Sequence, residues 1–200
     1  MRTHVVRDVS ELSVFSQKTD GTLWWGMNGL ILIEAVVFGS LVSAYFFLRA
    51  QAVEWPPGGI DPPELLLPTI NTLVLLASSF VLHWGDKGIQ DGRQRQLMIG
   101  VLGAAALGAL FLVLKVVEYA DAPYKWDSHA YGSLVWTIVG FHSAHVFSLL
   151  LKTLVVGALS ARGYFTSQRR AGVTINGVYW HFVVGVWVPL YVVLYWVPRI

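Results

Sequence analysis

Glu34 is an acidic side chain in the middle of an apolar run, LILIEAVVFGSLVSAYFF. If this run is a helix that begins near residue 23, Glu34 lies about 16 Å along it, because a helix rises about 1.5 Å per residue. An isolated ionised carboxylate at that depth in hydrocarbon costs several kcal/mol, so the group must be protonated, hydrogen-bonded to another helix or near water. Glu34 is therefore either a proton site beside an internal cavity or a neutral group that bridges two helices.

Two histidines, His142 and His145, stand three residues apart in the segment GFHSAHV, so a helix would place them on one face. This spacing could hold a metal ion from one side, but a third ligand is needed, and the most obvious is Glu34 on another helix. The alternative is a polar stripe that forms hydrogen bonds between helices or to lipid headgroups. A row of small residues favours this alternative because it permits close packing: Gly140, Ala144 and Ser148.

Tyr179, Trp180 and His181 begin the aromatic segment YWHFVVGVWVPLYVVLYW. Trp180 and Trp187 fall on one stripe of a helix, with His181 and Tyr179 to either side. A groove between helices that holds a lipid or a partner helix would give the indole and imidazole groups hydrogen-bond partners. The alternative is an aromatic cluster at the cytoplasmic membrane interface.

Glu118 ends another apolar segment, within one helical turn of Lys115. The simplest interpretation is a local ion pair or a surface anchor, and a gating role is the alternative. Lys115 and Lys152 lie within apolar segments but near their ends, so we expect their long side chains to extend to the membrane interface.

The composition places these residues in a membrane protein. Of the 200 residues, 55% are hydrophobic and 13% are charged, whereas charged residues make up about a quarter of an ordinary soluble domain. The absence of cysteine excludes cysteine ligands for copper or an iron–sulfur cluster. No basic block is dense enough to indicate nucleic-acid binding.

Five apolar segments are long enough to cross about 30 Å of hydrocarbon as helices. They are residues 23–49, 65–85, 97–119, 131–160 and 174–197. Loops rich in proline, glycine and polar residues separate them. The sequence therefore predicts an N-terminal arm over residues 1–22 and one all-α membrane domain of five transmembrane helices over residues 23–200.

Lysine and arginine are distributed unequally between the two ends of these helices. One end has nine: Arg2, Arg7, Lys18, Lys87, Arg93, Arg95, Arg162, Arg169 and Arg170. The other end has three: Arg49, Lys125 and Arg199. Because positive residues concentrate on the cytoplasmic side, we expect the N-terminus in the cytoplasm and the C-terminus outside.

Five motifs occur here in one order. They are LILIEAVVFGSLVSAYFF, EWPPGGIDPPELLLPTINTLVLLASS, LKVVEY, GFHSAHV and YWHF followed by an aromatic helix. Together they resemble subunit III of the haem–copper terminal oxidases, and the resemblance covers roughly residues 20–200. Each motif alone is weak, but the collinear set is specific. The chain is similar to the short, five-helix form of that subunit.

The resemblance implies a V-shaped bundle whose cleft holds phospholipid, in the cytoplasmic membrane of a bacterium. It implies a subunit without haem or copper of its own, packed on subunit I of a proton-pumping oxygen reductase, with subunit II and possible larger respiratory assemblies as further partners. The residue matching Glu34 reacts with carbodiimides in that family, whose subunit III supports proton uptake. The recurring family motifs include the positions of His142, His145, Glu118, Tyr179, Trp180 and His181.

Two positions depart from the family pattern: Ser143 replaces the usual glycine, and Val184 replaces a common aspartate. An accessory subunit of a nitric oxide reductase system is the nearest alternative function. An independent transporter would need a continuous polar path, and the helices offer little beyond Glu34, His142 and His145. A metalloenzyme has too few candidate ligands.

Overall fold

The structure, a computed structural model, describes residues 21–61 and 63–200. The described residues form five long α-helices and no strand. The helices are α1 (Thr22–Gln51), α2 (Leu66–Gln90), α3 (Gln94–Ala120), α4 (Ala130–Ala161) and α5 (Ala171–Tyr191). Each is long and apolar enough to cross a membrane, if α5 is taken with the short helical turns that follow it. The predicted all-α, multi-pass membrane architecture is confirmed.

The helices extend beyond the apolar segments that predicted them. The connection between α2 and α3 is only residues 91–93, whereas the sequence predicts a loop over residues 86–96. Hydropathy identifies only the part of a helix that lies in the hydrocarbon core of the membrane. The helix can continue with polar residues where its end reaches water, so the predicted segments are too short. Gly92 makes the short turn possible, because its φ of 75° is a conformation that side chains with a Cβ rarely adopt.

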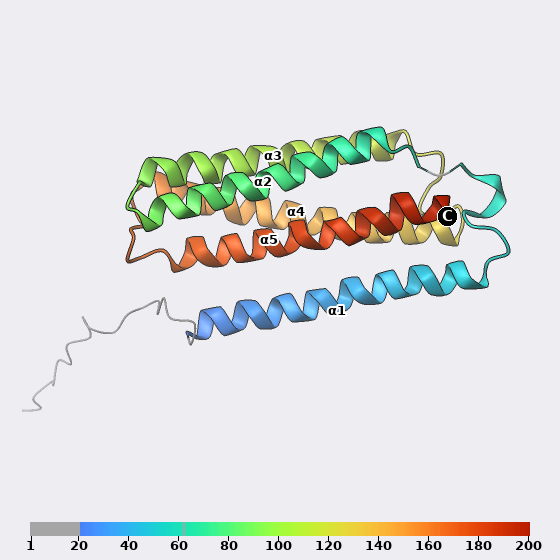
Figure 1. Cartoon of the computed structure of the whole chain (residues 1–200), viewed down its shortest axis with the longest axis horizontal. Coiled ribbons are helices and arrows are strands. Elements are labelled where there is room, and N and C mark those ends of the chain that lie inside the picture. Colours follow the sequence, from blue (N-terminus) through green and yellow to red (C-terminus); the bar gives the residue numbers. More distant parts are fainter. Residues whose placement is uncertain (1–20, 62) are drawn as a thin grey trace, which may run out of the picture.

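Helices α2, α3, α4 and α5 form a bundle in which each packs against the next and α5 returns to α2 (Figure 1). Helix α1 lies along the side of this bundle and packs mainly against α4 and α5. The start of α1, the α2–α3 turn and the α4–α5 loop lie at one end of the molecule, and the C-terminus lies at the other (Figure 1). The V shape and lipid cleft stay predictions. Of the predicted arm over residues 1–22, residues 1–20 lie outside the described residues.

Helices α2 and α3 approach most closely where two glycines face each other. A Cβ added at Gly100 would lie 2.5 Å from the Cα of Gly85, which is too close for any side chain. About two helical turns further along α3, Gly108 accommodates the Trp180 ring, which would be 3.0 Å from an added Cβ. The glycines of α3 therefore set how closely α2 and α5 approach α3.

The small-residue row on α4 does not pack against the other described helices. Gly140, Ala144 and Ser148 are exposed, and no atom lies within 4 Å of a Cβ added at Gly140. Helix α4 instead turns His142, Val146 and Leu149 to the core, so the row of small residues lies on the opposite face. The close contact predicted for this row is therefore not formed with the chain's own helices.

Candidate functional site

Glu34 on α1 meets side chains from α5 and α4 deep within the helices. The Tyr179 hydroxyl donates a hydrogen bond to Glu34 Oε1 at 2.8 Å, and His145 Nε2 lies 3.6 Å from the same oxygen. The Glu34 and His145 side chains are largely covered, each 14% exposed, and Glu34 Oε2 is buried with no hydrogen-bond partner among the described residues. The three helices therefore meet around one carboxyl group.

The hydrogen bonds of His145 determine what this cluster can do. His145 Nδ1 lies 2.7 Å from the carbonyl oxygen of Phe141, which can only accept, so Nδ1 carries a proton. In a neutral imidazole Nε2 then has a lone pair facing the Glu34 oxygen. Attraction between these groups requires a proton on Glu34 or a second proton on His145.

Lys152 adds a positive charge near this cluster. Its Nζ lies 5.0 Å from the centroid of the Tyr179 ring. An ammonium over an aromatic face is attracted by the ring quadrupole. The spacing in the sequence predicts that Lys152 shares a face of α4 with His145. It does not predict that Lys152 contacts Tyr179 on α5.

His142 has a different environment from His145. It is fully buried, its Nε2 lies 3.1 Å from the carbonyl oxygen of Val183, and its ring packs 4.6 Å from Trp187. The two histidines therefore turn to different helices instead of to one metal ion. Over residues 21–61 and 63–200, no group of three or more His, Cys, Asp or Glu side chains is placed to hold a metal.

The aromatic stripe of α5 is hydrogen-bonded to hydroxyl groups of α2. The pairs are Trp180 with Ser78 (3.0 Å), Trp187 with Thr72 (2.9 Å), His181 with Ser79 (2.5 Å) and Tyr191 with Thr69 (2.6 Å). The hydroxyl groups fix the rotation of α5 against α2, because each buried indole N–H needs an acceptor. The Ser/Thr positions of α2 form a polar stripe that helical periodicity could have revealed.

Val184 lies among the buried residues of α5, with 4% exposure. An apolar side chain is stable at this position because it needs no hydrogen-bond partner, whereas an aspartate there would need one. The departure from the family pattern is therefore consistent with the local packing.

A second polar cluster joins α3 to the end of the chain. Lys115 Nζ donates to Glu118 Oε2 at 2.7 Å and to the Tyr195 hydroxyl at 2.9 Å, and that hydroxyl donates to the other oxygen of Glu118. The ion pair predicted for Lys115 and Glu118 is present. The expectation that Lys115 extends to the membrane interface is wrong, since the residue is only 2% exposed.

The aromatic residues around Lys115 explain its inward orientation. Its Nζ lies 4.6 Å from the Trp187 ring centroid and 5.1 Å from that of Tyr195. Tyr195 belongs to a π-helical segment, η2 (Val192–Trp196), which follows Pro189 and precedes the 3-10 turn η3 (Val197–Arg199). This wider helix directs the Tyr195 hydroxyl at the ion pair. Nothing in the sequence distinguishes Tyr195 from its aromatic neighbours.

Comparison with known proteins identifies the family. The family model described as "Cytochrome c oxidase subunit III" matches residues 3–198. The chain belongs to the cytochrome c oxidase subunit III family. It is 38% identical over 175 residues to a cytochrome c oxidase subunit 3 from Thermostichus vulcanus, and the match covers 87% of each chain. It is also 33% identical to the Synechocystis subunit over 86% of this chain and 74% of that protein.

A relative from Locusta migratoria, also named cytochrome c oxidase subunit 3, is 32% identical over 96% of this chain and 75% of its own. The resemblance drawn from the five motifs is confirmed.

Proposed function

We propose that this chain is the accessory subunit III of a respiratory haem–copper terminal oxidase. The oxidase reduces oxygen to water with proton translocation, and its haem and copper lie in partner subunits. The observation that carries this proposal is the family match over residues 3–198, together with relatives named cytochrome c oxidase subunit 3. The described side chains contribute no metal-binding group of their own.

The main partner is subunit I, which this subunit stabilises by contact within the membrane. The exposed apolar face of α1 supports such contact: Leu32, Ile33 and Val36 are each more than 60% exposed. An apolar helix face can be covered by acyl chains or by a partner helix. Subunit II and a larger respiratory assembly are further partners.

Phospholipid binds in the cleft of a V-shaped arrangement between α1 and the remaining helices. The packing of α1 mainly against α4 and α5 supports this, because it leaves much of α1 free of protein contact. The polar candidates for contact with lipid or between helices are His142, His145, Tyr179, Trp180, His181, Trp187 and Glu118. Of these, His145 and Tyr179 face Glu34 of α1.

Glu34 supports proton uptake by the oxidase. Its hydrogen bond from Tyr179, its proximity to His145 and its unpartnered second oxygen suit a group that gains and loses a proton. The subunit lies in the cytoplasmic membrane of a bacterium with its N-terminus in the cytoplasm, as the excess of Lys and Arg at that end supports.

The experiment that tests this function is purification from the native membrane. The chain is tagged at Ile200, which is exposed. The native membranes are crosslinked and then extracted in mild detergent. A reduced-minus-oxidised visible spectrum is recorded and copurifying chains are identified by mass. We expect haem bands and a large haem–copper subunit.

A colourless preparation without partners after crosslinking would contradict the oxidase function. Transport by the chain alone would then be tested.

The same preparation from a Glu34→Gln variant tests the proton role of Glu34. Gln keeps an acceptor for the Tyr179 hydroxyl, so we expect normal assembly but slower proton uptake during turnover. Loss of the whole complex would show that Glu34 is required for assembly instead.

A further inference from the structure

Helix α4 begins at a histidine that caps it. The backbone of His129 is extended, and the N–H of Gly132 donates a hydrogen bond to its Nδ1 atom at 2.9 Å. This is the geometry of a helix N-cap, in which a side chain accepts from one of the free N–H groups of the first turn. The residue types preferred at this position are Ser, Thr, Asn and Asp, which accept through oxygen. A histidine accepts through a nitrogen that can also take up a proton.

This hydrogen bond determines the charge of the His129 ring. A backbone N–H can only donate, so Nδ1 must keep its lone pair, and the proton of the neutral ring lies on Nε2. In the doubly protonated ring both nitrogens are donors, and the Gly132 N–H then has no acceptor on His129. Imidazole groups normally take up this second proton between about pH 8 and pH 5. The cap is therefore formed at high pH and lost as the pH falls.

The surroundings of His129 do not favour the charged ring. Nε2 is buried without a hydrogen-bond partner among the described residues, and the salt bridges within residues 21–61 and 63–200 do not include His129. The positive end of the α4 dipole lies at this terminus and repels a cation. Protonation therefore removes an acceptor and adds an unfavourable charge at the same place.

The cap also fastens the loop between α3 and α4, residues 121–129. This loop lies directly against the first turn of α4, where a Cβ added at Gly132 would be 2.6 Å from the carbonyl oxygen of Lys125. The Ser133 hydroxyl donates a hydrogen bond to the carbonyl oxygen of Trp126 at 2.6 Å. The capping residue joins this loop to the helix, so loss of the cap loosens both.

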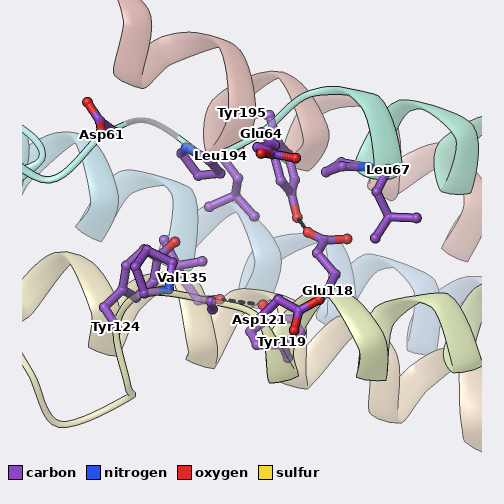
Figure 2. A pocket seen from close by; sticks show the side chains of 14 residues that line it. Asp61, Glu64, Leu67, Glu118, Tyr119, Asp121, Tyr124, Val135, Leu194 and Tyr195 are labelled. Atoms are coloured by element: carbon purple, nitrogen blue, oxygen red, sulfur yellow. Dashed lines mark hydrogen bonds between the residues drawn. The ribbon is translucent and has the colours of Figure 1, made fainter.

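The fastened loop is also one wall of a cavity. The His129 ring packs on Tyr124 of the loop, with ring centroids 5.6 Å apart. Tyr124 lines a cavity of about 470 Å³ together with residues 121–123 of the same loop. Figure 2 shows Tyr124 near Val135 of α4 at this cavity. The state of the cap therefore affects how firmly this wall is held.

We propose that His129 is a pH-dependent cap. Its neutral ring holds the α3–α4 loop on α4, and protonation of the ring releases this loop and the first turn of α4. The loop lies at the end of the molecule opposite the α2–α3 turn (Figure 1). The distribution of Lys and Arg predicts that this end lies outside, so the cap responds to the pH of the outer medium.

The other ionisable groups around His129 normally titrate outside this pH range. They are Tyr124, Lys125 and Asp127 of the loop, Tyr131 of α4, Tyr45 of α1, and, near these tyrosines, Glu118 of α3 and Arg199 of the C-terminal turn. Tyrosine, lysine and arginine titrate above about pH 9, and aspartate and glutamate below about pH 5. Burial raises the pKa of Tyr124 further. A change between about pH 8 and pH 5.5 therefore indicates a histidine.

Hydrogen exchange measured by mass spectrometry tests the proposal on the intact complex purified with this subunit. The protection of amides in the first turn of α4 is compared at about pH 8 and about pH 5.5, after correction for the chemical exchange rate at each pH. We expect this protection to fall about tenfold at the lower pH, because the first turn opens more readily without its cap. Amides in the middle of α4 should keep their protection at both pH values.

Two variants of the capping residue separate the cap from its titration. His129→Asn provides an acceptor that does not titrate, since asparagine caps helices through its amide oxygen, and its first turn should be equally protected at both pH values. His129→Ala provides no acceptor and should show low protection at both. The matched control is His83→Asn, which removes an exposed histidine of α2 and should retain the wild-type pH dependence.

Three results would overturn the proposal. The first is equal protection of the first turn at both pH values in the wild-type chain, a comparison that needs no variant. The second is an acid-induced loss in His129→Asn as large as in the wild type, because another group would then be responsible. The third is disappearance of the pH dependence in His83→Asn, which would assign the titration to α2.

Discussion

The buried ion pair of Lys115 and Glu118 shows how strongly one residue can depend on another. Their side chains are 3% and 17% exposed, and Tyr195 bridges them. A buried pair is a weak source of net stability, because both charges lose their hydration. Removal of one member is nevertheless costly, since the other charge then remains buried alone.

We therefore expect Lys115→Met to lower the free energy of unfolding by about 3–5 kcal/mol, because Glu118 loses its counter-ion. Thermal unfolding of the purified subunit in mild detergent measures the loss. The control is Lys152→Met, which removes a half-buried ammonium that forms no salt bridge among the described residues. The double variant Lys115→Met/Glu118→Gln should recover part of the loss. Equal stability of the two single variants would contradict this account.

At the scale of elements, the crossing of α2 and α3 depends on the absence of side chains. Gly100 and Gly85 bring the two backbones together, because neither residue carries a side chain that would hold them apart. The small residues Gly140, Ala144 and Ser148 on α4 make no such contact with the described helices, because small residues permit close packing but do not select which face of a helix turns inward.

Gly100→Ala should separate α2 from α3 and lower the free energy of unfolding by about 1–3 kcal/mol, the usual effect of overpacking. Gly140→Ala makes the same chemical change on an exposed face where nothing lies within 4 Å, and should be close to neutral. Thermal unfolding of both variants in one detergent gives the comparison. A Gly140→Ala variant that unfolds as early as Gly100→Ala would argue against a packing effect.

At the scale of the whole molecule, the alternation of five helices places the α2–α3 and α4–α5 connections at one end and the C-terminus at the other (Figure 1). Arg93, Arg95, Arg162 and Arg169 lie at the first end. The positive-inside rule therefore predicts that this end lies in the cytoplasm.

The absence of native cysteine makes this orientation simple to test. Ser167 lies in the α4–α5 loop and Asp127 in the α3–α4 loop, and both are exposed. In right-side-out vesicles, a membrane-impermeant maleimide should label Asp127→Cys at once and Ser167→Cys only after permeabilisation. The reverse pattern would show that the N-terminus lies outside.

The sequence by itself determined the five membrane helices, the family and the Lys115–Glu118 contact. These are local properties, set by the length of apolar segments, the order of motifs and a separation of three residues along one helix. Only the tertiary structure decided which distant side chains meet. Tyr179 reaches Glu34 across 145 residues, and Tyr195 reaches Lys115 across 80. Such contacts depend on how each helix is rotated and where it crosses its neighbours, which hydrophobic pattern alone does not specify.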